Sequence, residues 1–193
     1  MRLAPLVLSV RESGRARAGA NGSCPFCGHR AVEGRETIPC ADGTRDACCA
    51  PCHLVRHLER ETIAEEAALV WMPELTQAAV IAFAHAAHAR LFEAGALHWA
   101  ANPFAARRHD DFGGALDCVR AFEARSAEAE ARLGTASPRV LAAALLSAKP
   151  AVYQDRARLL GGLRLWPRGR FFVDGEDVYP ELVAGCARVS PGC

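Results

Sequence analysis

The clearest helical pattern of apolar and polar positions lies between Thr76 and Gly95. Large apolar residues recur there at helical spacing: Val80, Ile81, Phe83, Leu91 and Phe92. This spacing predicts a helix with one apolar side. Thr76 is a suitable N-cap because its hydroxyl can accept a hydrogen bond from a first-turn amide, and Gly95 is a suitable C-terminal stop.

The same pattern predicts further helices on either side of this one. We expect them at residues 52–66, 116–133, 138–148 and 150–160. Gly134 should end the second, whose highly charged middle, 123–132, predicts a solvated face. Ser137 and Pro138 form an N-cap and first-position pair for the third. Most of the chain after the first fifty residues is therefore predicted to be helical.

Short strands are predicted where apolar residues alternate or form brief runs. Residues 1–12 alternate loosely, residues 68–72 form an apolar run ended by Pro73, and further strand pieces are expected at 163–166 and 171–173. A linker rich in glycine and alanine, residues 14–22, follows the first. The predicted class is α+β.

Residues 23–61 contain too few large apolar residues to form a core alone, but they hold two CxxC pairs. Cys24 and Cys27 form the first, and Cys49 and Cys52 the second. Four thiolates at this spacing can close a tetrahedron around zinc, with a hairpin between the pairs returning the chain to the metal. Full cysteine ligation leaves the metal no open position, so we predict a structural zinc ion.

Three neighbouring residues remain alternative ligands. Cys40 lies within the expected hairpin, Cys48 directly precedes Cys49, and His53 follows Cys52. The CxxC spacing favours Cys49 with Cys52, and the helix beginning there would place Cys52 near the positive end of the helix dipole.

Composition narrows the possible functions. The chain has 193 residues with 23 basic and 22 acidic side chains, so no strong overall field draws it to nucleic acid or anionic lipid. No apolar run reaches the roughly 18 residues that span a bilayer. The apolar run 3–10 is too short for a secretory signal, so the nine cysteines indicate metal ligation in a reducing cytoplasm rather than disulfides.

Other residues that could carry chemistry have simpler explanations. His85 and His88 could bind a metal only with a third ligand, and we interpret them as polar positions on an alanine-rich helix. The loop cluster 107–111 is a weak candidate for a partner contact. Trp71, Met72 and Trp166 are expected to pack in the core or at an edge, although an exposed pair could anchor a peptide. No role is assigned to three further cysteines, Cys118, Cys186 and Cys193.

The cysteine motifs resemble those of the zinc-bound HNH endonucleases. The resemblance rests on CPFCG, a hairpin containing Thr37, Ile38 and Pro39, and CAPCH running into a helix. In that family a hairpin histidine activates water, but residues 30–48 contain none, and Glu36 stands near the expected place. His53 and His57 remain the best substitutes for this base. Without a general base, hydrolysis should fall by about 10² to 10⁴ fold.

The wider series of motifs resembles the IcmJ (DotN) family of the type IVB (Dot/Icm) secretion system. It comprises the N-terminal strand, CPFCG, DACCAPC, LVWMPELTQ and LRLWPRGRFF, in this order from about Leu3 to Phe172. The resemblance implies a zinc fold similar to the HNH module, with Cys24, Cys27, Cys49 and Cys52 as zinc ligands. It also implies a cytoplasmic subunit that binds the coupling ATPase DotL.

These observations predict a treble-clef zinc module, residues 1–66, packed closely on a mainly helical body, residues 67–193. The expected function is that of a non-catalytic adaptor in a type IVB coupling complex, associated with the inner membrane only through its partners. The alternatives are a metal-dependent HNH-like endonuclease that has moved its base, and a zinc-containing nucleic-acid binder.

Overall fold

The computed structural model describes residues 3–11, 23–29, 38–39, 45–46, 48–106 and 112–187. Its helices are α1 (Ala50–Arg56), α2 (Ile63–Glu66), α3 (Gln77–Glu93), a 3₁₀ helix η2 (Leu97–Ala100), α4 (Ala115–Ala124), α5 (Ser126–Leu133), α6 (Pro138–Ser147), α7 (Pro150–Gln154), α8 (Arg156–Leu159) and α9 (Tyr179–Ala187). Its strands are β1 (Ile38–Pro39), β2 (Arg45–Asp46), β3 (Ala67–Trp71), β4 (Leu163–Pro167), β5 (Phe172–Val173) and β6 (Glu176–Asp177). These elements confirm the predicted α+β class. Within the described residues, no helix is long and apolar enough to cross a membrane.

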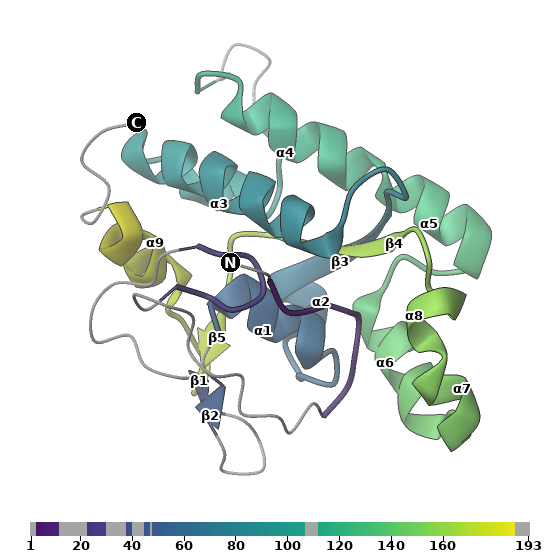
Figure 1. Cartoon of the computed structure of the whole chain (residues 1–193). Helices are drawn as coiled ribbons and strands as arrows, with labels where there is room; N and C mark the ends of the chain where they lie inside the picture. Colours follow the sequence, from purple (N-terminus) through teal and green to yellow (C-terminus); the bar gives the residue numbers. More distant parts are fainter. Residues whose placement is uncertain are drawn as a thin grey trace.

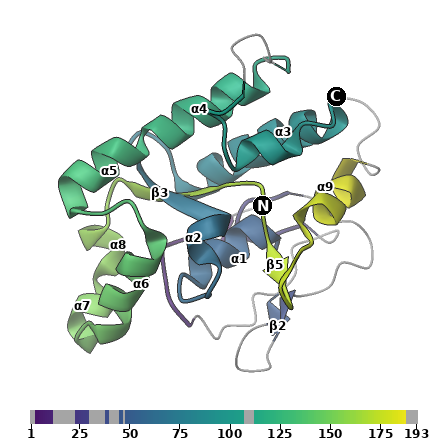
Figure 2. The same cartoon turned by 180° about the vertical axis from the view of Figure 1, so that it is seen from behind.

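The centre of the fold is the antiparallel pair β3–β4, which joins segments almost a hundred residues apart in the chain. Leu69 pairs with Leu165, and both side chains are fully buried. Helices α3, α4 and α5 lie on one side of this pair and α1 and α2 on the other, while α6, α7 and α8 gather at one end (Figures 1 and 2). Strands covered on both sides are expected to be apolar, as these are.

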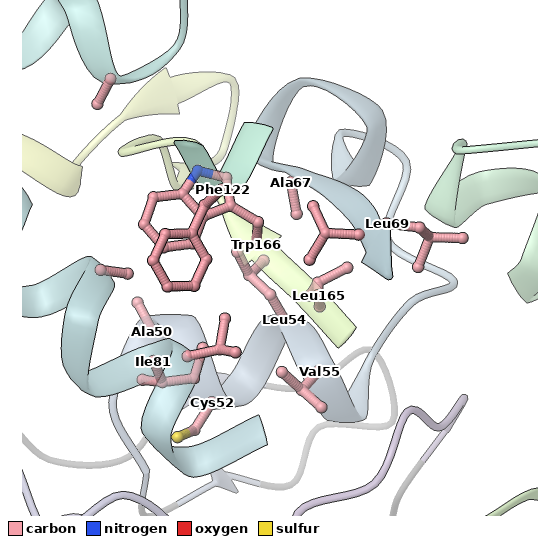
Figure 3. Packing of buried hydrophobic residues seen from close by; sticks show 14 of the residues in the cluster. Ala50, Cys52, Leu54, Val55, Ala67, Leu69, Ile81, Phe122, Leu165 and Trp166 are labelled. Carbon is pink, nitrogen blue, oxygen red and sulfur yellow. The ribbon is translucent and has the colours of Figure 1, made fainter. Parts of the chain in front are cut away.

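Trp166 of β4 is completely buried in the apolar cluster (Figure 3). Its ring stacks on Phe122 of α4 at 4.4 Å between centroids and meets His88 of α3 edge-on. Leu54 of α1 lies beside Leu165 in the same apolar cluster. The cluster therefore includes residues from both segments that the sequence separates at residue 66.

Side chains and loop carbonyls satisfy the backbone at the edges of the β3–β4 pair. The amide of Gln77 accepts from the backbone N–H of Leu165 at 2.8 Å and donates to its carbonyl at 2.9 Å. On the other edge, the N–H groups of Leu69 and Trp71 donate to the carbonyls of Ala136 and Arg125. A two-stranded sheet is marginal alone, and these bonds complete it.

A buried carboxylate fastens the C-terminal hairpin, β5–β6, to the first half of the chain. Glu66 is fully buried and accepts two hydrogen bonds from Arg60, at 2.7 and 3.0 Å. It also accepts from the backbone N–H of Phe172 at 2.8 Å, while Arg60 donates to the Phe172 carbonyl. The guanidinium of Arg60 lies 4.3 Å above the ring of Phe171. This network satisfies a charge that would be costly to bury alone.

Several predicted elements are confirmed. Helix α3 begins after Thr76, whose hydroxyl accepts from the N–H of Ala79, and the chain turns at Gly95 with a φ of 67°. Gly134 ends α5 in the left-handed conformation, and Pro138 opens α6. The expected packing role of Trp166 and Met72 is also confirmed, because both are buried.

The predicted helix from Cys52 to Glu66 is wrong in its middle. Helix α1 ends at Arg56, and the chain turns before α2 begins at Ile63. The N–H of Leu58 donates to the carbonyl of Ser9 instead of continuing the helix. The apolar period survives because this turn still directs Leu58 and Ile63 into the core.

The predicted N-terminal strand is absent from residues 3–11. This segment is bound by turns and helix ends rather than by another strand: Ala4 donates to the carbonyl of Pro25, and Ser9 donates to that of Val55. Tyr153 of α7 donates its hydroxyl to the carbonyl of Val10. The alternating apolar pattern of this segment indicated that part of it is buried, but not which part of the chain it packs against.

Two other boundaries differ from the prediction. The expected long helix is divided at Arg125 into α4 and α5, where the Arg125 carbonyl accepts from the N–H of Trp71 in β3. Ser137 precedes α6 without a side-chain cap bond. Helix α9 was not predicted, although Pro180 and Glu181 supply a typical first turn. The linker 14–22 lies outside the described residues.

Two features require glycine at position 162: its positive φ and the close approach of the Trp71 ring. Its φ is 90°, and an added Cβ would lie 2.6 Å from the ring of Trp71. Gly175 has a similar φ of 84° but open space around it, so it is a matched control. We expect Gly175→Ala to cost about 1–2 kcal/mol from backbone conformation alone. Gly162→Ala should cost roughly 1–3 kcal/mol more, because it also overpacks the Trp71 site.

Urea unfolding of the two variants measures this difference. Equal losses of unfolding free energy would show that Trp71 moves aside freely and would contradict the prediction.

Candidate metal centre

The first CxxC pair lies in a tight turn fixed by backbone hydrogen bonds. The N–H of Gly28 donates to the carbonyl of Cys24 at 2.9 Å, and the N–H of Cys24 donates to that of His29 at 2.8 Å. Gly28 has a φ of 75°, which glycine adopts without steric cost. Phe26 is buried beneath the guanidinium of Arg56, 4.8 Å from the ring centre. The turn therefore presents both sulfurs while its middle residue anchors it to α1.

The second CxxC pair lies at the start of α1. Cys49 is the N-cap, its carbonyl accepts from the N–H of His53, and Cys52 lies in the first turn. Pro51 is favourable here because a first-turn residue needs no intrahelical N–H bond. Cys52 is completely buried and Cys49 partly so. Between the two pairs, β1 and β2 form a short antiparallel hairpin, as predicted, with Ile38 opposite Asp46.

The two pairs bring their sulfur atoms together. Those of Cys24, Cys27, Cys49 and Cys52 all lie within 4.8 Å of one another. Cys27 and Cys49 are 3.6 Å apart, well beyond the roughly 2.05 Å of a disulfide. A tetrahedral ion with bonds of about 2.3 Å to sulfur needs sulfur–sulfur distances of about 3.8 Å. The group is therefore compatible with a four-coordinate metal ion.

Two of the alternative ligands, Cys48 and His53, are not members of this group. Cys48 is half-buried and does not belong to it, and His53 points its ring toward the interior, edge-on to Phe171 at 5.8 Å. In the part of the chain that the structure describes, no other cluster of histidine, cysteine or carboxylate side chains has such geometry. Cys40 lies outside the described residues. The four-cysteine set thus agrees with the CxxC spacing.

The electrostatics of the group favour a bound cation. Burial raises the pKa of Cys52, and hydrogen bonds with Cys24 and Cys27 together with burial raise that of Cys49. Hydrogen bonds from Cys27, Cys49 and Cys52 lower the pKa of Cys24, which favours its thiolate form. Four thiolates this close repel one another strongly unless a divalent cation lies between them. Sulfur ligands of this kind favour zinc or iron.

His85 is placed differently from the prediction. It was expected at an ordinary polar position, but its Nε2 lies 3.4 Å from the sulfur of Cys49. Its ring stacks on that of His29, with centroids 3.7 Å apart and planes 5° from parallel. Burial lowers the pKa of His85 to about 3, so the ring is neutral near pH 7. No periodicity in the sequence connects residue 85 with the cysteines.

His53, His57 and His88 pack locally. His88 is fully buried, and its Nδ1 lies 2.8 Å from the hydroxyl of Tyr179 in α9, so it does not share a site with His85. His53 and His57 are both buried, with stacked rings 4.2 Å apart. The Nδ1 of His57 also lies 3.0 Å from a carboxylate oxygen of Glu59.

Among the described residues, Cys118 does not belong to the cysteine group. Cys118 is half-buried on α4, and burial raises the pKa of its thiol. Cys186 lies on α9. Glu36, the loop cluster 107–111 and Cys193 lie outside the described residues.

Comparison with known proteins does not identify a family or a function for this site. No family model matches the chain, and no curated protein matches it. What the site can do therefore follows from its own atoms. Four sulfurs can bind a metal ion on all sides and hold two chain segments together, but they leave no coordination position for a substrate.

Removal of one sulfur should release the metal, and Cys118 offers a matched control. We expect the purified chain to carry one metal ion and Cys52→Ser to lose most of it. The loss should be accompanied by local unfolding, because a structural zinc site contributes on the order of 10 kcal/mol. Cys118→Ser should keep the metal because Cys118 is not part of the group.

Elemental analysis together with circular dichroism measures both effects. A metal content that is unchanged in Cys52→Ser, or that falls equally in Cys118→Ser, would contradict the assignment.

Proposed function

We propose that the chain is a zinc-stabilised, non-catalytic adaptor of a type IVB secretion coupling complex, related to the IcmJ (DotN) proteins that its motifs resemble. The observation that carries the proposal is the convergence of Cys24, Cys27, Cys49 and Cys52, because a site closed by four sulfurs serves folding rather than substrate binding. Zinc is the metal that we assign, since it favours tetrahedral thiolate sites and needs no redox partner.

The order of elements around the sulfurs supports a treble-clef, HNH-like module. A glycine-containing CxxC turn, the hairpin β1–β2 and the helix α1 follow one another along the chain. The second ligand pair lies at the start of that helix, as the treble clef requires.

The motifs that carry the resemblance lie together in the fold. LVWMPELTQ contains most of β3 and LRLWPRGRFF contains β4, and these are the two strands of the central pair. The N-terminal segment contacts the first cysteine motif and the helix that carries the second, because Ala4 donates to Pro25 and Ser9 to Val55 of α1. Segments that are far apart in the chain thus form one connected structure, which supports treating them as one related unit.

The positions of the histidines count against the nuclease alternative. A general base must reach the attacking water, but His53 and His57 lie in the interior with 1% and 4% of their surface exposed. No histidine occurs between residues 30 and 48, where the family resemblance would require one. A nucleic-acid binder would need a strong basic surface, and the net charge of the chain is only +1.

The helical end of the molecule offers surface for a protein partner. Four large apolar side chains on α6, α7 and α8 are exposed: Val140, Leu146, Val152 and Leu159. Exposed apolar residues that gather in one region mark sites of association. The proposed partner is the coupling ATPase, which would hold this adaptor at the cytoplasmic side of the inner membrane without membrane insertion of its own.

Co-purification tests the proposal. The tagged chain, isolated from its own cells, should carry one zinc ion and retain the coupling ATPase. The Cys52→Ser variant should lose both, because the module no longer folds, whereas Cys118→Ser should keep both. Recovery of zinc without any membrane-complex subunit would contradict the adaptor role.

The same preparations distinguish the alternatives. Nicking of plasmid DNA that requires magnesium or manganese and disappears in His53→Ala or Glu36→Ala would establish the nuclease. Binding of DNA without cleavage, weakening steeply with salt, would establish the nucleic-acid binder.

A further inference from the structure

The ring of His85 gives the cysteine group a contact from outside the two CxxC motifs. It lies in the middle of α3, which belongs to the helical body, and its Nε2 is 3.4 Å from the sulfur of Cys49. A cysteine bound to a metal is a thiolate and can only accept a hydrogen bond. A neutral imidazole has one N–H, so the contact is favourable only when Nε2 carries that hydrogen.

His29 extends this contact to the first CxxC motif. It follows Gly28 in the turn, its carbonyl accepts from the N–H of Cys24, and its ring stacks on His85. Helix α3 therefore contacts both cysteine motifs, through a hydrogen bond on one and a ring stack on the other. Neither contact uses the coordination positions of the metal.

Charge explains why such a donor matters. Four thiolates around a divalent cation carry two excess negative charges, and a partly buried group of this kind requires donors to disperse them. An N–H directed at one sulfur stabilises its charged thiolate form and makes protonation of that sulfur harder, so the sulfur stays available to the metal. Groups that contact metal ligands in this way commonly change metal affinity by about 10- to 100-fold.

We propose that His85 donates its Nε2–H to the Cys49 thiolate and, stacked on His29, positions that thiolate and retards loss of the metal. This role rests on the metal centre proposed above. It makes His85 a positioning residue rather than a ligand, and it links metal retention to the docking of the cysteine module on α3.

Three substitutions separate the hydrogen bond from the ring stack. His85→Phe keeps an aromatic ring for His29 but removes the N–H, whereas His85→Gln keeps an N–H donor without the ring. His98→Ala is the matched histidine control, because His98 is exposed and contacts Trp99 rather than the cysteines. All are made in the full chain loaded with one zinc ion.

Zinc transfer to a chromogenic chelator measures retention. We expect His85→Phe to release zinc about 10-fold faster or more, with the wild-type zinc content at the start. His85→Gln should recover part of the difference, and His98→Ala should match wild type. Rates for His85→Phe equal to wild type would overturn the proposal.

Cobalt in place of zinc gives a spectroscopic readout that a purely structural role would not change. A thiolate that loses its hydrogen bond gives up electrons more easily, so the thiolate-to-cobalt charge-transfer band of His85→Phe should move to lower energy. An unmoved band would overturn the proposal.

The metal content of the two proteins shows whether the role of His85 or the metal centre itself is wrong. A His85→Phe chain that cannot hold one zinc ion while wild type can would make His85 a ligand, and so would overturn the positioning role alone. A wild-type chain without metal would overturn the metal centre itself.

Discussion

The rest of the cysteine module depends on the convergence of four sulfur atoms. The segment between residues 23 and 61 has little apolar surface of its own, so hydrophobic burial alone cannot fix its turn, hairpin and short helix. Sulfurs within 4.8 Å of one another are electrostatically unfavourable as thiolates without a cation and favourable with one. Metal binding would then contribute directly to the folding free energy of this segment.

The helical body covers the two-stranded sheet β3–β4. Trp166 and Leu165 enter the core on opposite sides of β4, and Gln77 satisfies the strand edge with its side-chain amide. Glu66 and Arg60 then bind the C-terminal hairpin through charge-assisted hydrogen bonds. The body can thus hold α3 rigidly beside the cysteine group, which is what a positioning role for His85 requires.

The proposed adaptor role depends on packing and binding and needs no catalytic group. Four-cysteine ligation would leave a metal no open position, and the two histidines of α1 and its C-cap are buried. Apolar side chains remain exposed on α6, α7 and α8. Such a division of roles suits a protein in which a metal secures the fold and another surface meets the partner.

The sequence by itself determined the features that depend on local spacing and on residue chemistry. The two CxxC pairs indicated which sulfurs meet, Thr76 and Gly95 marked the ends of α3, and the apolar runs located β3 and β4. Only the tertiary structure decided where a long-range hydrogen bond interrupts a local pattern. The carbonyl of Ser9 accepts a hydrogen bond from the N–H of Leu58, where the apolar period alone would continue the helix. Residues 3–11 likewise form hydrogen bonds with a turn and a helix end instead of with a strand. His85 reaches Cys49 across 36 positions for the same reason: periodicity reports which side of an element is buried, but not which distant residue lies against it.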